Sequence, residues 1–236
     1  MNHLELVAKS YDWDIDSYGT KDGKSYTDLP DYITNNPNYL KWKTEFENGT
    51  TIGGGCKKEV KDYLSPEKDM KFIQLGCSLN LMFKGYDEWL STYYGVDISI
   101  KTIKLLNEFV AKNNLPVGSL HCGSIHETPF DDSYFDIGEC IGVLEYYEKD
   151  FVEKAIIEFH RIMKPNGKFV LDIPNIESPS GRAMMLIEEY MGRPEKFDMR
   201  PHEFENIIKN YFMIEKRGET GIEAGMGISY YLRCEK

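Results

Sequence analysis

The sequence predicts an α/β fold: a Rossmann-like, seven-stranded, mostly parallel sheet with helices on both faces and a C-terminal antiparallel hairpin. From residue 57 onward, short apolar runs alternate with helical patterns, which is typical of parallel strands joined by crossover helices. The last two strand-like runs are too close in sequence for a crossover helix, so they should pair antiparallel. A length of 236 residues with 41% hydrophobic residues suits one large domain with an appendage.

Five short apolar runs predict the parallel strands. They cover residues 71–75, 93–97, 119–122, 134–141 and 168–173. Runs of this length between turn residues are typical of buried strands. The two hairpin strands are expected at about 211–217 and 227–234, on either side of a glycine-rich turn.

Helical patterns occupy most of the intervals between these runs. They cover 57–65, 99–114, 150–163, about 180–191 and about 202–209. The clearest is 150–163, where Val152, Ala155, Ile156 and Phe159 lie on one stripe with helical spacing. This helix should end at residues 164–167, since Pro165 and Gly167 do not continue a helix.

Residues 1–50 differ from the rest of the chain. They are rich in Tyr, Asp, Asn and Thr and show only weak periodicity. We expect an N-terminal extension (1–50) ahead of the main domain (51–236). Two interpretations stay open: an irregular set of short helices packed on the main domain, or a lid with an aromatic wall over a pocket.

Charge and cysteine content exclude several classes of protein. The net charge of −11, from 39 acidic and 28 basic residues, disfavours nucleic acid and anionic membrane surfaces as partners. No apolar run reaches the roughly 18 residues of a membrane span. The five cysteines form no CxxC and no Cys/His cluster, so we expect no metal site, no disulfide scaffold and a reducing, cytoplasmic setting.

The end of the first strand is the expected ligand site, because open α/β sheets bind ligands at the carboxyl ends of their strands. Gly76 follows that strand directly and allows close approach of a ligand to the backbone. Asp97 ends the second strand, 23 residues beyond Gln74. A carboxylate there can accept hydrogen bonds from both hydroxyl groups of a ribose.

These residues carry a resemblance that covers about residues 50–236. FIQLGCS (72–78) and YYGVDIS (93–99) are similar to the first two motifs of class I S-adenosylmethionine-dependent methyltransferases that act on small molecules. The family includes enzymes of ubiquinone and menaquinone biosynthesis and phosphoethanolamine methyltransferases. Residues 121–175 resemble its long central block, and ENGTTIGGG (47–55) resembles a segment at the methionine end of the cofactor in phosphoethanolamine methyltransferases.

The resemblance implies S-adenosylmethionine as the cofactor and methyl transfer to an N, O, S or C atom of a small molecule. The implied cofactor-binding residues are Thr51, Gln74, Gly76, Cys77, Ser78, Asp97, Ile98, Ser124 and Ile125. Tyr146 and Tyr147 follow the fourth strand, where substrate meets the methyl group in relatives, and are the candidate catalytic residues.

The sequence departs from the family pattern at several motif positions. Gln74 replaces an acidic residue, Ser124 replaces the adenine-binding aspartate and Tyr146 replaces a histidine. Ser78 and Asn80 replace two glycines of the first motif. The alternative function is therefore a catalytically weakened methyltransferase-like domain that binds a ligand or a protein partner. A nicotinamide dehydrogenase is disfavoured because GxGxxG is absent.

Overall fold

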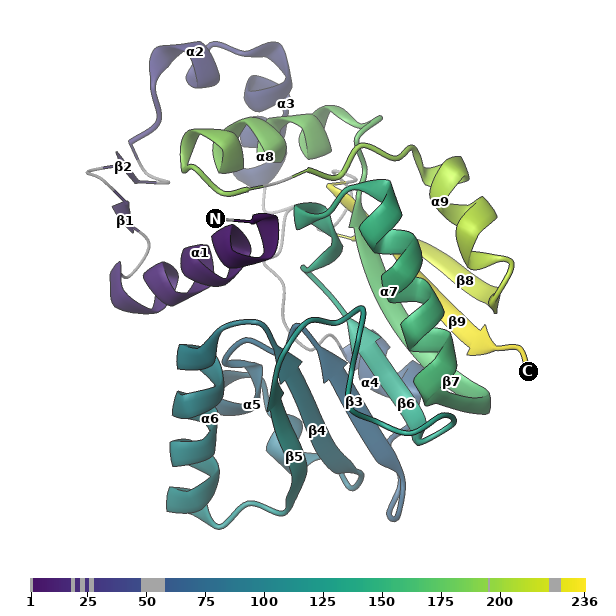
Figure 1. The fold of residues 1–236 in the computed structure, drawn as a ribbon. Coiled ribbons are helices and arrows are strands. Elements are labelled where there is room, and N and C mark those ends of the chain that lie inside the picture. The colour runs from purple at the N-terminus through teal and green to yellow at the C-terminus, as the bar shows by residue number, and fades with distance from the viewer. Residues whose placement is uncertain are drawn as a thin grey trace.

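The computed structural model describes residues 2–17, 20–21, 24–25, 28–47, 58–194, 196–220 and 226–236. Within them, seven strands form one sheet in the order β5-β4-β3-β6-β7-β9-β8 (Figure 1). The strands are β3 (Lys71–Leu75), β4 (Thr92–Asp97), β5 (Val117–Cys122), β6 (Phe135–Cys140), β7 (Met163–Pro174), β8 (Phe212–Thr220) and β9 (Gly227–Cys234). The pairs among β3 to β7 are parallel, and β9 is antiparallel to both β7 and β8.

Helices cover both faces of this sheet. One face packs against α4 (Lys58–Leu64), α5 (Asn80–Phe83), the short 3-10 helix η1 (Tyr86–Glu88) and α6 (Ile100–Asn113), with Phe72 central in that core. The opposite face packs against α7 (Lys149–Ile162) and α9 (Pro201–Ile208), with Ile73 and Leu75 in the second core. Neighbouring residues of β3 thus face opposite cores, as the two-residue period of a strand requires.

The N-terminal segment lies across the carboxyl ends of the strands (Figure 1). It comprises α1 (His3–Ser17), β1 (Thr20–Lys21), β2 (Lys24–Ser25), α2 (Asp31–Thr34) and α3 (Pro37–Glu47). α3 runs beside α8 (Pro179–Tyr190), and Ile33, Tyr39, Ala183 and Ile187 join in a small apolar cluster. The 3-10 helix η2 (Leu144–Tyr146) follows β6 and precedes α7 in the chain.

The expected fold class is confirmed, and one strand begins earlier than expected. β7 begins at Met163 rather than near 168. Its register against β6 shifts between the pairs Phe135–Met163 and Ile137–Lys168. Residues 164–167 of β7 therefore lie opposite one residue of β6, and Asn166 has a φ of 63°. Residues 123–134 join β5 to β6 without a helix. In the C-terminal hairpin, the later strand β9 lies inside the sheet and β8 forms its edge.

Candidate functional site

The turn after β3 strongly favours glycine at its first position. Gly76 has a φ of 73°, a conformation that costs other residues about 1–2 kcal/mol. A Cβ atom there would lie 2.3 Å from Cγ2 of Val143. The amides of Gly76 and Cys77 both donate to the carbonyl oxygen of Val96 on β4, at 2.8 and 2.9 Å. The turn is therefore held tightly between the ends of β4 and β6.

Asp97 lies at the centre of the strand ends and is only 4% exposed. The Ser78 amide donates to its Oδ2 at 2.7 Å, and the Ser99 amide donates to its Oδ1 at 2.9 Å. Burial raises the pKa of Asp97, and the amides of Ser99 and Ser78 offset only part of that effect. Since the Ser99 side chain caps α6, one carboxylate links the glycine turn to a helix N-terminus.

A small cavity opens beside Asp97. Its volume is about 20 Å³, enough for about one water molecule. Its lining residues come from four strand ends and one helix: Val7, Tyr11, Gly76, Asp97, Ile98, Gly123, Ser124, Ile125, Val143, Tyr146 and Tyr147. The structure therefore brings together Gly76, Asp97, Ile98, Ser124, Ile125, Tyr146 and Tyr147, all named from the sequence as site residues.

Helix α1 lies across from the carboxyl ends of the strands (Figure 1), and its residues Val7 and Tyr11 line the cavity. Three polar contacts hold the helix there. His3 Nε2 donates to the carbonyl oxygen of Tyr146 at 2.5 Å, and the Tyr11 hydroxyl donates to the carbonyl oxygen of Gly142 at 3.5 Å. The Ser99 hydroxyl donates to Asp12. Because the Ser99 amide also donates to Asp97, Ser99 links α1 to the central carboxylate.

Tyr146 ends η2 and Tyr147 follows it, two residues before α7, and both side chains are almost fully buried. The Tyr146 ring meets Tyr11 edge to face at 5.6 Å, and its hydroxyl accepts a hydrogen bond from Arg193 at 3.0 Å. The Tyr147 ring stacks on Phe151 at 3.8 Å. Burial raises the pKa of both tyrosines, so at neutral pH they offer neutral hydroxyl groups and aromatic surface rather than a base.

Gln74, by contrast, faces away from the cavity into the other core. Its Nε2 donates to Glu139 Oε1 at 2.7 Å, and its Oε1 accepts from the Tyr93 hydroxyl at 2.6 Å. The Tyr86 hydroxyl also donates to Glu139 Oε1, while Glu139 Oε2 has no hydrogen-bond partner among the described residues. Burial raises the pKa of Glu139 to about 7. Cys77 is buried as well, and burial raises the pKa of its thiol.

Sequence reasoning missed Glu139 and, on α1, Val7 and Asp12, whereas Tyr11 belongs to the tyrosine-rich segment expected as an aromatic wall. An acidic residue within the apolar strand FDIGEC was the available signal for Glu139, since such a group is seldom buried without partners. The side chain of Val7 gave no signal of this kind. Thr51, predicted to bind the cofactor, lies outside the described residues and stays a prediction. The same holds for Tyr18, a tyrosine of the N-terminal extension expected near the methyl-accepting position.

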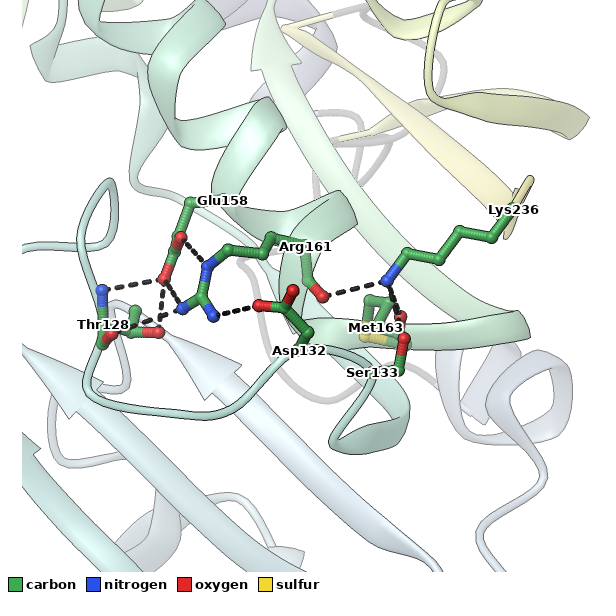
Figure 2. A network of polar contacts seen from close by, with 7 residues as sticks. All are labelled: Thr128, Asp132, Ser133, Glu158, Arg161, Met163 and Lys236. Atoms are coloured by element: carbon green, nitrogen blue, oxygen red, sulfur yellow. Dashed lines mark hydrogen bonds and ion pairs between the residues drawn. The ribbon is translucent and has the colours of Figure 1, made fainter.

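The loop that carries Ser124 and Ile125 is fastened to α7 by an ionic network (Figure 2). Glu158 Oε1 accepts from the Thr128 amide at 2.8 Å and from its hydroxyl at 2.5 Å. Arg161 donates to both Glu158 and Asp132 at 2.7 Å. Burial alone would raise the pKa of Glu158, but the hydrogen bonds from Arg161 and Thr128 hold it below its usual value. Glu158 thus stays ionised and anchors this loop.

The described part of the chain contains neither a metal-binding cluster nor a membrane-spanning helix. No group of three His, Cys, Asp or Glu side chains there is placed to hold a metal ion. No helix there has both the length and the apolar character needed to cross a membrane.

Comparisons with known proteins agree with this geometry. Residues 73–171 match the family model described as a methyltransferase domain. An uncharacterised protein of Methanocaldococcus jannaschii is 28% identical over 145 residues, which are 60% of this chain and 56% of that protein. The chain therefore spans little more than half the length of this curated relative.

Solved structures show the same fold at low sequence identity. A protein from Pyrococcus horikoshii superposes with a TM-score of 0.65 at 18% identity, over 88% of this chain and all of that one. Geranyl diphosphate C-methyltransferase from Streptomyces coelicolor, solved with S-adenosyl-L-homocysteine, also has a TM-score of 0.65, at 12% identity over 99% and 98% of the two chains. A methyltransferase in complex with the Trm112 activator from Haloferax volcanii reaches 0.62 at 13% identity, over 89% and 100%. These likenesses establish the fold of class I methyltransferases.

Proposed function

From the premise that residues 73–171 form a methyltransferase domain with the class I fold, we propose that the protein is an S-adenosylmethionine-dependent methyltransferase. Its substrate is a small molecule, methylated on an N, O, S or C atom. One observation carries the proposal: Gly76, Asp97, Ser124 and Ile125 come from the ends of three strands and line a single cavity.

The residues around the cavity fit the chemical groups of this cofactor. Asp97 offers a carboxylate for the ribose hydroxyls, and Ile98 and Ile125 offer apolar surface for a flat base. Gly76 and Gly123 expose backbone without a side chain at the cavity. An added Cβ atom would collide with Val143 at Gly76 and with His121 at Gly123. Bound there, the cofactor supplies an electrophilic methyl group on a sulfonium.

The volume of the cavity requires α1 to move when the cofactor binds. About 20 Å³ is far below the roughly 300 Å³ at which small-molecule sites begin. The strand ends are fixed by the sheet, whereas α1 is held by a few hydrogen bonds and by Val7 and Tyr11. We therefore assign the N-terminal segment (residues 1–50) as a lid over the main domain (51–236), as one reading of the sequence had it.

The substrate side lies where α1 meets Tyr146 and Tyr147. Tyr11, Tyr146 and Tyr147 present aromatic surface there, and Arg193 reaches it from the segment after α8. Excluding water and aligning the acceptor atom are the main contributions that a protein makes to such a transfer. The enclosed geometry and the net charge of −11 favour a small molecule over a nucleic acid.

Titration with S-adenosyl-L-homocysteine by calorimetry tests the proposal. Asp97→Ala removes a charge-assisted acceptor, a loss of about 1.5–3 kcal/mol per hydrogen bond, so the dissociation constant should rise at least about tenfold. Asp87→Ala, at an exposed position before β4, is the matched control and should bind as the wild type does. Equal affinity of the wild type and Asp97→Ala would refute the placement.

A methyltransferase-like binding protein remains the second candidate. It is favoured by Gln74, whose amide is engaged by Glu139 and Tyr93 rather than directed at the cavity. Failure of the wild-type protein to bind S-adenosylmethionine or S-adenosyl-L-homocysteine would favour this candidate over the enzyme.

A further inference from the structure

Ser124 is paired with a histidine that no motif identified. The Ser124 hydroxyl lies 2.6 Å from Nδ1 of His126, and Ser124 itself lines the cavity. The His126 ring packs against Phe151 at 4.8 Å, and Phe151 stacks on Tyr147, another cavity residue. His126 is thus held by two residues that each connect it to the cavity wall.

The loop around this pair is fixed at its far end as well. Two residues beyond His126, Thr128 is bonded to Glu158 through both its amide and its hydroxyl. Figure 2 shows Arg161 completing that anchor between Glu158 and Asp132. The imidazole is therefore positioned by packing and by its loop, as a group that orients another side chain must be.

The pairing decides what the Ser124 hydroxyl can offer to a ligand. A serine hydroxyl has one proton to donate and two lone pairs that accept. Which atom donates across this contact depends on the histidine tautomer. With the ring proton on Nε2, Nδ1 accepts and the hydroxyl proton is committed to it. The hydroxyl oxygen then has only lone pairs to offer toward the cavity. It can accept a hydrogen bond from an N–H group of a ligand, and it repels a carbonyl oxygen.

We propose that His126 carries its ring proton on Nε2 and is a specificity-determining positioning residue, which makes Ser124 an obligate acceptor and so selects a purine with a 6-amino group over one with a 6-oxo group. This inference rests on the proposed function, because it places the base of the cofactor between Ile98, Ile125 and Ser124. His126 acts through Ser124 and does not touch the ligand.

Two ligands that differ only at this position test the proposal. Dissociation constants of S-adenosyl-L-homocysteine and of its 6-oxo analogue, S-inosyl-L-homocysteine, are measured by calorimetry for the full-length protein. Three variants are compared with the wild type. They are His126→Phe, which keeps an aromatic ring against Phe151, Ser124→Ala, and the double variant that combines both changes. His202→Phe, on the exposed side of α9, is the control, and His126→Ala serves if the phenylalanine variant melts below the wild type.

The wild type and the control should prefer the 6-amino ligand by at least about tenfold. His126→Phe frees the hydroxyl to donate, so the preference should fall to within about threefold, mainly through tighter binding of the 6-oxo ligand. The double variant should match Ser124→Ala, because His126 has no effect without the hydroxyl. An unchanged preference in both His126 variants would overturn the inference alone, whereas a wild type that binds neither ligand would overturn the proposed function with it.

Discussion

Gly76→Ala is the substitution whose cost can be worked out most directly from the structure. The left-handed backbone at Gly76, with a φ of 73°, costs an alanine about 1–2 kcal/mol. The new methyl group would overlap Val143, whose Cγ2 would be only 2.3 Å away, and overpacking of a buried site costs about 1–3 kcal/mol. The free energy of unfolding should therefore fall by about 2–5 kcal/mol, as measured by urea denaturation.

Two other glycines separate these contributions. Gly85 has a φ of 71°, but its nearest neighbour would lie 3.9 Å from an added Cβ atom, so Gly85→Ala should cost the backbone strain alone, about 1–2 kcal/mol. Gly218 has nothing within 4 Å of such an atom. Gly218→Ala should change the free energy of unfolding by less than about 0.5 kcal/mol.

A double-mutant cycle with Val143→Ala tests the overlap itself. That change removes both Cγ atoms and leaves only the Val143 Cβ atom, at 3.2 Å. In the Val143→Ala background, Gly76→Ala should cost about 1–2 kcal/mol, close to the effect of Gly85→Ala. If Gly76→Ala is as costly there as in the wild type, contact with Val143 does not explain why glycine is needed at this turn.

Two further predictions concern carboxylates that accept hydrogen bonds. Burial raises the pKa of Glu139 from 4.5 to about 7, so the folded state binds this proton more tightly than the unfolded chain, and wild-type stability should fall as pH rises from about 4.5 to about 7. In Glu139→Gln, the free energy of unfolding should no longer decrease over this pH range. The variant should be more stable than the wild type by about 1–3 kcal/mol at pH 8, but not at pH 4.5. If the free energy of unfolding depends on pH in the same way in both proteins, the prediction is wrong. Asp12→Ala removes the hydrogen bond from Ser99 that holds α1 over the cavity, a loss of about 0.5–1.5 kcal/mol, so stopped-flow association of S-adenosyl-L-homocysteine should quicken about two- to tenfold. An unchanged or slower rate would mean that this contact does not limit access to the site.

The sequence alone determined the strands that carry the site and the strand ends at which Gly76 and Asp97 lie. Runs such as 71–75 and 93–97 lie in their strands as expected, because apolar periodicity is a local property that burial imposes on each segment. The order of these segments placed Gly76 and Asp97 at neighbouring strand ends, since parallel strands bring their carboxyl ends to one edge. The family resemblance added Ser124 and Ile125, which line the same cavity.

Tertiary structure decided which side chains meet. Gln74 and Glu139 are 65 residues apart, and only the register of β3 against β6 sets them opposite one another. That register turned Gln74 from the expected cofactor contact to the partner of a buried carboxylate. The contact between Asp12 and Ser99 depends likewise on where α1 docks across the strand ends. The periodicity of one segment predicts neither the docking of α1 nor the register of β3 against β6. Both depend on how surfaces from distant parts of the chain pack together.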